Sequence, residues 1–418
     1  MAAIPSPLIR AAERALTEVL AMTQPADAVM SRFFRNHATL GARDRAFVAE
    51  TVFGVLRRFR LLEAGGARSP RECVLGWLAR CGGRNLRELE PLSTLERERL
   101  AAIKALDEKS LPPAAQAELP DWLAQRLAEA HGEAEMVAIG RGLQQSAPLD
   151  LRVNTLKAER DAVLARLRED GIGCEPTRLA PAGIRLEGKP AINRHPLFLE
   201  GEVEVQDEGS QLLGYLVAPR RGEMVVDFCA GAGGKTLHLG ALMRSLGRLY
   251  AFDVSGGRIA QLKPRLKRSG LANVHPQRID SENDARVRRL SAKVDRVLVD
   301  APCSGSGTLR RNPDLKWRQS PESVAQLTAK QAAILASAAR LVKPGGRLVY
   351  ATCSLLPEEN EDIVSAFLAR DEGFALVPAA PVLEAQGVRV EADPWLRLYP
   401  HRHGTDGFFA AVLERRPR

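Results

Sequence analysis

The stretch MVVDFCAGAGGKT, residues 224–236, carries the clearest fold signal of the 418-residue chain. An apolar run that ends at Asp227 predicts a strand, and a helix is expected over Thr236–Leu246. Between them lies a turn that contains Gly231, Gly233 and Gly234. Glycine lets the backbone of such a turn approach a ligand closely, and the N-terminus of the next helix offers N–H donors. The stretch therefore predicts a nucleotide-like ligand at the end of a strand, with a plain tight turn as the structural alternative.

Three nucleotide-binding patterns compete for this loop. A phosphate-binding P-loop requires glycine where Cys229 stands, and a dinucleotide fingerprint requires glycine where Thr236 stands. The remaining pattern, an acid at the strand end followed by Gly-x-Gly, is typical of S-adenosylmethionine-dependent methyltransferases.

Two further acids follow the next strand candidates. The strand Arg248–Asp253 ends in a carboxylate, and an acid at the end of the second strand of such folds bonds ribose hydroxyls. Asp280 follows the third candidate, Val274–Ile279, and is expected to reach an adenine edge. Either acid alone could be an ordinary strand-end residue, but both in register favour a cofactor site.

Two cysteines follow the fourth and fifth strand candidates. Strand Val294–Val299 leads through Asp300 to Cys303, and strand Arg347–Thr352 leads directly to Cys353. In a doubly wound sheet these strands are neighbours, so both thiols are expected at the carboxyl edge, where such folds bind ligands. Buried packing or a disulfide would also suit two cysteines, but neither explains the adjacent cofactor loop.

A thiol pair gives this site a chemistry. Carbon 5 of a pyrimidine becomes nucleophilic when a thiolate adds to carbon 6, after which a base removes the carbon 5 proton and elimination frees the thiolate. From the residues alone, either Cys353 or Cys303 can be the nucleophile and the other the proton-transfer group. Asp300 is expected beside the base, where it helps to absorb charge near ring nitrogen 3.

Composition and charge limit the partners. The chain is 45% hydrophobic and 27% charged, contains six thinly spread cysteines and has no long uncharged stretch. We expect a monomeric cytoplasmic protein with no signal peptide, membrane span, disulfide framework or metal site. Residues 221–320 hold 19 basic and 9 acidic side chains, a net of +10 in a chain of net +9. A solvated basic face is the simpler interpretation, but beside a candidate site this charge favours a polyanionic substrate such as nucleic acid.

Residue composition and hydrophobic periodicity along the chain predict three regions. Residues 1–140 read as helical, with an amphipathic helix within Ala42–Arg60, and the prolines of Ser110–Pro120 indicate a linker or a helix boundary. Residues 141–220 read as a small α+β insert. Residues 221–418 alternate strand and helix patterns, as in a parallel α/β sheet.

Four ordered motifs resemble the RsmB/Nop/Sun family of RNA cytosine-5 methyltransferases. They are DFCAGAGGKT (227–236), DAPCSGSGTLRRNPDLKW (300–317), YATCSLLPEENE (350–361) and PHRHGTDGFFAA (400–411). The segments LGARDRAFVAETVFGVLRR (40–58) and LDLRVNTLK (149–157) resemble the NusB-like helical domain and the start of the small RNA-recognition region of RsmB-type enzymes. The resemblance implies a Rossmann-like class I methyltransferase domain, a small α+β RNA-recognition insert and an all-α N-terminal domain.

The resemblance also assigns residues. Cys353 is the implied nucleophile, and Cys303 is implied to assist product release. The implied contacts to S-adenosylmethionine are Cys229, Ala230, Gly231, Ala232, Gly233, Gly234, Lys235, Asp253, Asp280 and Asp300. The family usually has Ala-Pro-Gly-Gly-Lys where this chain has Ala232 in place of the proline, which makes the loop less rigid but removes no donor.

The leading expectation is a cytosine carbon-5 methyltransferase that acts on 16S ribosomal RNA through a covalent cysteine–cytosine intermediate. One alternative is an RNA-binding antitermination-like or ribosome-assembly module without catalysis. Another is a uridine or DNA pyrimidine carbon-5 methyltransferase; in the DNA version the nucleophile would stand in a Pro-Cys motif, as Cys303 does. Two smaller expectations concern neighbouring residues: Glu358 and Glu359 are assigned to a helix start, and a phosphate-gripping or solvated loop is assigned to Arg310, Arg311, Lys316 and Trp317.

Overall fold

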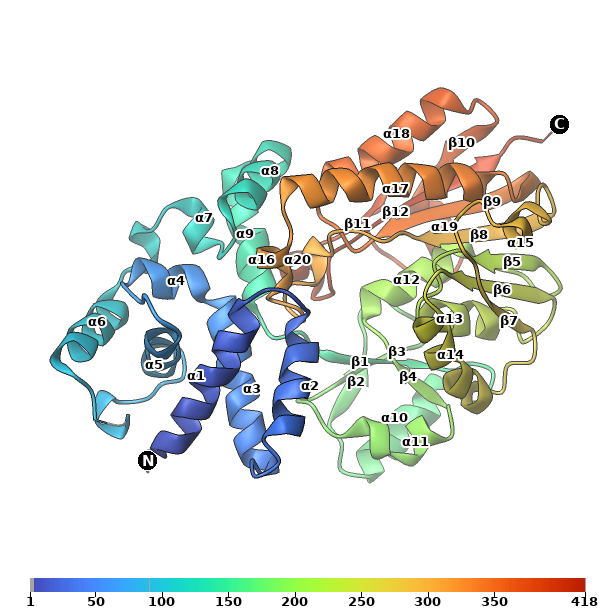
Figure 1. The fold of residues 1–418 in the computed structure, drawn as a ribbon. Coiled ribbons are helices and arrows are strands. Elements are labelled where there is room, and N and C mark those ends of the chain that lie inside the picture. Colours follow the sequence, from blue (N-terminus) through green and yellow to red (C-terminus); the bar gives the residue numbers. More distant parts are fainter. Residues whose placement is uncertain (1–3, 90, 418) are drawn as a thin grey trace. The chain divides into compact units, whose positions relative to one another are not determined.

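The computed structural model describes residues 4–89 and 91–417 and divides into two compact units (Figure 1). One unit contains the chain up to Ser146 together with Thr308–Pro321, and the other contains Ala147–Gly307 and the chain from Glu322 onward. The chain therefore leaves the second unit after Gly307, contributes a short segment to the first, and returns. We call the first the helical unit and the second the α/β unit.

All regular elements in the described part of the helical unit are helices. They are α1 (Ser6–Leu20), α2 (Ala26–Asn36), α3 (Ala42–Arg57), α4 (Phe59–Ala64), α5 (Pro70–Arg80), η1 (Leu86–Glu88), α6 (Thr94–Ala105), η2 (Glu108–Ser110), α7 (Pro113–Gln116), α8 (Asp121–His131), α9 (Glu133–Gln144) and α16 (Leu315–Arg318). The expected amphipathic helix is α3, and its Val48, Val52, Val55 and Leu56 are fully buried in one core with α1, α2 and α5.

Residues 110–120 form a packed corner of the helical unit, so the interpretation as a linker is wrong and the helix-boundary alternative holds. Pro113 starts α7, and Pro120 immediately precedes α8. Proline suits these positions because the first N–H groups of a helix have no partner within the helix. Ala117, Glu118 and Leu119 are each 1% exposed, which shows how tightly the corner is packed.

A small antiparallel sheet opens the α/β unit. Its strands are β1 (Leu149–Val153), β2 (Cys174–Pro176), β3 (Gly183–Leu186) and β4 (Val203–Val205), in the order β2-β3-β1-β4. The accompanying helices are α10 (Arg160–Glu169), η3 (Ile192–Arg194) and α11 (Pro196–Leu199). Leu151, Val163 and Ile184 belong to one buried cluster, so this part has its own core.

The large sheet has eight strands. They are β5 (Met224–Asp227), β6 (Arg248–Asp253), β7 (Val274–Arg278), β8 (Val294–Asp300), β9 (Val342–Thr352), β10 (Phe374–Val377), β11 (Leu396–Leu398) and β12 (Phe408–Arg415). The order is β10-β12-β9-β8-β5-β6-β7, with β11 paired to β12. The five strands from β7 to β9 are parallel, whereas β10, β11 and β12 pair antiparallel. This order confirms the Rossmann-like fold and the expected pairing of the fourth and fifth strands.

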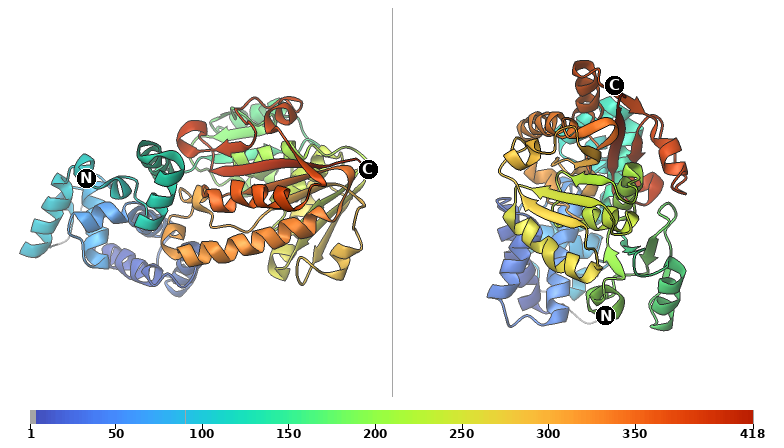
Figure 2. Two further views of the ribbon diagram at one scale, coloured as in Figure 1. Left: turned by 90° about the horizontal axis from the view of Figure 1, so that it is seen from above. Right: turned by 90° about the vertical axis from the view of Figure 1, so that its right-hand side faces the viewer.

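Helices cover both faces of the large sheet (Figures 1 and 2). On one face α12 (Glu208–Val217), α13 (Gly234–Leu242), α14 (Gly256–Ser269) and α19 (Ala379–Glu384) share a core with Val225, Leu298 and Val349. On the other face α15 (Ala285–Arg288), α17 (Pro321–Ala339) and α18 (Glu361–Arg370) share a core with Val226, Val297 and Tyr350. Alternate residues of each strand thus enter opposite cores, as a sheet buried on both faces requires.

The carboxyl ends of the parallel strands meet at one edge of this sheet. After β5 the chain runs to β6 and β7 on one side, and then returns to β8 and β9 on the other. The switch between β5 and β8 leaves a crevice position for ligands at that edge. The remaining short elements, η4 (Ser306–Thr308), η5 (Pro357–Glu359) and α20 (Pro400–His403), all lie in connections between strands. Within residues 4–89 and 91–417, no helix is both long and apolar enough to cross a membrane.

Candidate active site

The glycine-rich loop turns sharply between β5 and α13. Gly231 and Gly233 have φ values of 56° and 85°, in the left-handed region that favours glycine. A Cβ at Gly233 would also lie 2.1 Å from Leu262 Cδ1, so any other residue there would force the Leu262 side chain to shift. The loop is therefore shaped to bring backbone close to a ligand at the N-terminus of α13.

Asp253 fixes this loop from the end of β6. Its Oδ2 accepts a hydrogen bond from the Gly231 N–H at 2.9 Å, and its Oδ1 accepts one from the Ser255 N–H at 2.7 Å. The side chain is buried, and each carboxylate oxygen retains a second lone pair for a ligand hydroxyl. Asp253 thus supports the loop in addition to the ribose contact that the sequence predicts for it.

Asp227 is a site residue that the sequence analysis used only as a strand-end marker. Its carboxyl group is fully buried, and Oδ2 accepts the Thr236 hydroxyl at 2.6 Å while Oδ1 has no partner. Burial raises the pKa of Asp227 to about 7 against the opposing Thr236 bond, and the nearby charges of Asp300 and Asp253 add to the rise. A buried acceptor without a partner fits a bound ligand that carries a donor.

Lys235 and Asp300 form an ion pair between α13 and the end of β8. The Nζ of Lys235 lies 2.8 Å from Asp300 Oδ2. Burial opposes the charge of Lys235, but Asp300, and to a smaller extent Cys353, raise the pKa of the ammonium above its ordinary value. A fixed positive charge, the ammonium of Lys235, therefore lies beside Asp300 and close enough to Cys353 to interact with it.

The two cysteines meet at the sheet edge. Cys303 Sγ and Cys353 Sγ are 3.4 Å apart, and both are free thiols. The register explains this closeness, because Asp300 pairs with Ala351 across β8 and β9, and the Ala301 N–H donates to Ala351 O at 2.8 Å. The hydrogen bond with Cys353, followed by burial, raises the pKa of Cys303 well above its ordinary value.

The other predicted cofactor residues lie around the same edge. Cys229 is in the glycine-rich loop, and burial, followed by the charges of Asp300 and Asp227, raises the pKa of its thiol. Asp280 lies two residues beyond β7, with an exposed side chain beside a surface hollow that Arg278 and Arg286 also line. All the predicted site residues thus follow or join carboxyl ends of the parallel strands.

Glu359 is a second residue whose importance the sequence analysis missed. The helix-start interpretation is incomplete, because its side chain is fully buried and bonds Ser304 and Ser354, the residues after the two cysteines. The signal in the sequence was its position six residues after Cys353, but no spacing rule indicates burial.

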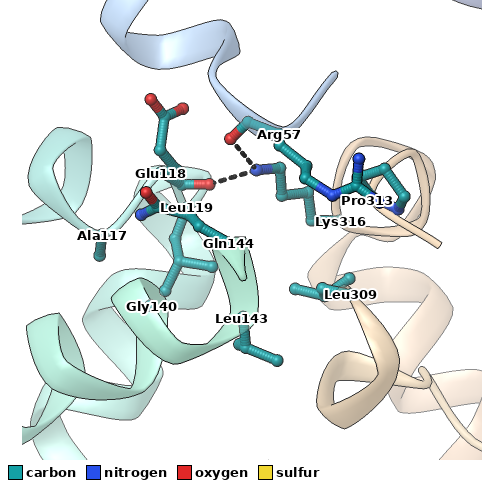
Figure 3. Close-up of a pocket in the computed structure, with 10 residues that line it drawn as sticks. All are labelled: Arg57, Ala117, Glu118, Leu119, Gly140, Leu143, Gln144, Leu309, Pro313 and Lys316. Carbon is teal, nitrogen blue, oxygen red and sulfur yellow. Dashed lines mark hydrogen bonds between the residues drawn. The ribbon is translucent and has the colours of Figure 1, made fainter. Parts of the chain in front are cut away.

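Lys316, one of the cations expected to grip phosphate or to lie in a solvated loop after Cys303, is buried instead. Thr308–Pro321 belongs to the helical unit, and Lys316 is only 4% exposed. Its Nζ donates to the carbonyl oxygens of Glu118 at 2.6 Å and Arg57 at 3.4 Å, beside a small pocket of that unit (Figure 3). Burial lowers the pKa of Lys316 to about 8. The ring of Trp317 packs edge-on against the ring of Phe59, with 5.5 Å between the ring centres. Trp317 and Phe59 thus join α16 to α4.

Comparisons with known proteins agree with this geometry. Residues 214–414 match the model of the 16S rRNA methyltransferase RsmB/F family, and residues 119–193 match the RsmF/B-like ferredoxin-like domain. A probable ribosomal RNA small subunit methyltransferase B from Synechocystis sp. is 34% identical, over 93% of this chain and 95% of that protein. The ribosomal RNA small subunit methyltransferase B of Sodalis glossinidius is 39% identical over 70% of this chain and 65% of its own length.

Solved structures give the same fold. The crystal structure of PH0851 superposes with a TM-score of 0.78 at 30% identity and covers 99% of both chains. A methyltransferase homologue from Pyrococcus horikoshii is also 30% identical, with a TM-score of 0.63 over 74% of this chain and all of that one.

The parallel sheet, the glycine-rich loop and the strand-end acids define an S-adenosylmethionine-dependent methyltransferase. The buried Asp227 acceptor and the tight cradle at Gly233 fit such a cofactor. Within that class, the chain belongs to the RsmB/F family of 16S rRNA methyltransferases. It is therefore an enzyme whose substrate is ribosomal RNA. The alternative of an RNA-binding module without catalysis is wrong.

Proposed function

We propose that the enzyme methylates carbon 5 of a cytosine in 16S ribosomal RNA through a covalent bond between Cys353 and the base. The observation that carries the proposal is the pair of free thiols 3.4 Å apart at the carboxyl edge of the sheet. A methyltransferase that acts on a nucleophilic oxygen or exocyclic nitrogen needs no thiol, whereas attack at carbon 6 does.

The cofactor residues are assigned on the same basis. We assign S-adenosylmethionine to the loop from Cys229 to Lys235, with Asp253 on the ribose hydroxyls, Asp280 on the adenine edge and Asp300 beside them. When bound, it supplies an electrophilic methyl group. Asp227 Oδ1 is the buried acceptor available to a donor of that ligand.

Cys353 performs the first step. Its thiolate adds to carbon 6, so that a carbon–sulfur bond forms and the double-bond electrons move toward carbon 5 and ring nitrogen 3. Lys235, held by Asp300 at 2.8 Å, places a positive charge where it stabilises the thiolate. The Asp300–Lys235 pair also absorbs part of the charge that reaches the ring.

Cys303 completes the reaction. After carbon 5 has gained a methyl group, its proton must leave, and the electron pair of that C–H bond re-forms the double bond as the Cys353–carbon 6 bond breaks. Cys303 lies within contact of the Cys353 sulfur and is assigned to take the carbon 5 proton while its own thiol proton passes to the departing Cys353 sulfur. The product is 5-methylcytosine with Cys353 free again.

Substitution of each cysteine tests the two roles. Cys353→Ala cannot form the carbon–sulfur bond, so we expect neither methylation nor an RNA adduct. Cys303→Ala can still attack but is expected to stall before elimination, which leaves protein covalently attached to RNA. Denaturing gels of each variant with substrate RNA and S-adenosylmethionine reveal the adduct as a slow-moving band.

The opposite results have clear meanings. A band from Cys353→Ala and none from Cys303→Ala would reverse the roles and favour the arrangement of DNA pyrimidine methyltransferases. No band from either variant, with both still active, would exclude covalent catalysis. Bisulfite sequencing of ribosomal RNA from a deletion strain tests the cytosine assignment separately.

We also propose that the enzyme acts as a cytoplasmic monomer. Free cysteines without a disulfide pattern agree with a reducing compartment. Light scattering of the purified protein at working concentration measures the oligomeric state, and a dimer mass would contradict the proposal.

A further inference from the structure

Glu359 places a fully buried carboxylate between the two cysteine loops. Its Oε1 accepts the Ser304 N–H at 2.8 Å and the Gln331 amide at 3.0 Å. Its Oε2 accepts the hydroxyls of Ser304 and Ser354, each at 2.5 Å. Four donors therefore meet the four lone-pair sites of one carboxylate.

These donors flank the two thiols. Ser304 directly follows Cys303, and Ser354 directly follows Cys353, so one side chain joins both loops. Gln331, on α17, also donates to the carbonyl oxygen of Pro302 at 2.9 Å, which fixes the residue before Cys303. The Cys303 loop is thus held on both sides of its thiol.

The network extends beyond the carboxylate. Ser306 Oγ lies 3.2 Å from Ser354 Oγ and accepts the Leu355 N–H at 2.8 Å, and the Gly307 N–H donates to Cys353 O at 2.9 Å. Every one of these bonds connects the loop after β8 with the loop after β9. Together with the bonds of Glu359, they hold the two loops at a fixed separation beyond what the strand register sets.

Burial of a carboxylate needs an explanation, because a charged group loses its hydration there. Neutral hydrogen-bond donors alone repay this cost incompletely. A helix-start role requires only proximity to the N-terminus of a helix, which an exposed acid such as Asp362 supplies on α18. Burial at the junction of two catalytic loops therefore points to a role in their geometry.

The negative charge has a second effect on the thiols. The hydrogen bond with Cys353 is the largest cause of the raised pKa of Cys303, burial is the next, and the charge of Glu359 acts in the same direction. Cys303 is thereby kept protonated, which suits a proton-transfer group better than a nucleophile.

We propose that Glu359 is a positioning residue that sets the Cys303–Cys353 distance by joining Ser304 to Ser354. The inference rests on the proposed thiol mechanism for its consequence in catalysis, but the geometry itself can be measured without RNA. Two independent readouts therefore apply.

The first readout uses a trivalent arsenical on the reduced protein. Phenylarsine oxide forms two arsenic–sulfur bonds with a close thiol pair, and its oxygen leaves as water with both thiol protons. We expect tight binding to the wild type and its loss in Cys303→Ser. Glu359→Ala should bind at least about tenfold more weakly, because the second thiol is no longer held in place.

The second readout is methyl transfer to ribosomal RNA. Displacement of a reacting group by about 1 Å costs on the order of 100-fold in rate. For Glu359→Ala we expect kcat to fall by about that factor while KM for RNA and the affinity for S-adenosylmethionine change little. The kcat of Glu359→Gln should lie between those of the wild type and Glu359→Ala, since an amide keeps one acceptor oxygen. Glu358→Gln, at the adjacent and half-buried acid, is the matched control and should resemble the wild type.

The outcomes separate the two proposals. Normal arsenical affinity and normal kcat in Glu359→Ala would overturn the positioning role. Weakened arsenical binding with normal methyl transfer would keep the positioning role and contradict the thiol mechanism. If Glu359→Ala does not fold, Ser304→Ala and Ser354→Ala each remove one hydroxyl donor, and unchanged arsenical affinity in both would overturn the proposal.

Discussion

At the scale of single residues, the site depends on acids whose surroundings differ. Asp253 and Asp300 each make close polar contacts, with backbone N–H groups and with Lys235 respectively. Asp227 is fully buried with one unpartnered oxygen, and its pKa is raised to about 7. Asp227 therefore changes charge near neutral pH in the free enzyme.

Asp227 should make the stability of the free enzyme depend on pH. Between about pH 4 and pH 7 the folded protein holds this proton while the unfolded chain has lost it, so the contribution of Asp227 to stability falls as pH rises through that window. The whole effect is about 4 kcal/mol at most. Denaturant unfolding from pH 5 to pH 8 should show the wild type losing stability relative to Asp227→Asn.

A matched comparison isolates this effect. Asp362→Asn, at an exposed position on α18, is the control. Its free energy of unfolding should differ from that of the wild type without following the pH dependence expected for Asp227→Asn. A difference between wild type and Asp227→Asn that is constant across the window would mean that the Asp227 carboxyl group ionises at its ordinary pH.

At the scale of elements, α14 shows why a count of charges overstates what RNA can reach. Arg265 and Arg268 on this helix both bind the buried carboxylate of Glu204, at 2.9 and 2.6 Å. Lys263 and Lys267 are exposed and line a surface hollow. The basic block of residues 221–320 therefore divides into cations that fasten the small sheet and cations that remain for a polyanion.

Removal of the exposed pair should weaken RNA binding in a salt-dependent manner. For Lys263→Gln with Lys267→Gln, we expect the slope of log affinity against log salt to decrease in magnitude by about 1 to 2, from two lost phosphate contacts. Filter binding to 16S RNA fragments over a salt series measures this slope. Lys343→Gln, at the second residue of β9, is the control. An equal effect there would mean that α14 has no special role.

The parallel strands and their ends could be predicted from the sequence, whereas their cross-links could not. Asp227, Asp253 and Asp300 end their strands where the alternation of apolar runs and glycines indicates, so the positions of the site residues followed from local pattern. The bonds of Glu359 to Ser304 and Ser354 link residues 55 and 5 positions away. Such contacts depend on which loops the sheet brings together, and periodicity carries no information about that.

At the scale of the whole molecule, each region predicted from the sequence is one continuous stretch of chain. The helical unit, in contrast, is built from two separate stretches. Thr308–Pro321 lies within the range assigned to the methyltransferase region and folds with the helical unit. Its composition resembles an ordinary basic loop, and only burial of Asp314, Lys316 and Leu309 reveals its place. Sequence patterns report local amphipathicity and therefore miss a short segment that packs far from its neighbours in the chain.

Asp314 should stabilise the helical unit across this long separation. Its Oδ2 accepts the N–H of Ala26 at 3.1 Å and so caps α2, whose preceding Pro25 has no capping side chain. Asp314→Ala should lower the free energy of unfolding by about 1 kcal/mol and speed hydrogen exchange at Ala26. Asp314→Asn keeps an acceptor oxygen and should lose less; equal losses in both variants would show that the cap does not act through this bond.

The divided helical unit also has a consequence for synthesis on the ribosome. The 175 residues from Ala147 to Pro321 take about 9 to 35 s to translate at about 5–20 residues per second. Throughout that time α2 lacks its cap, and the carbonyl groups of Arg57 and Glu118 lack the ammonium of Lys316. The helical unit begins to emerge first, but it is completed only after most of the α/β unit has been made, because its last helix, α16, follows Gly307 in the chain.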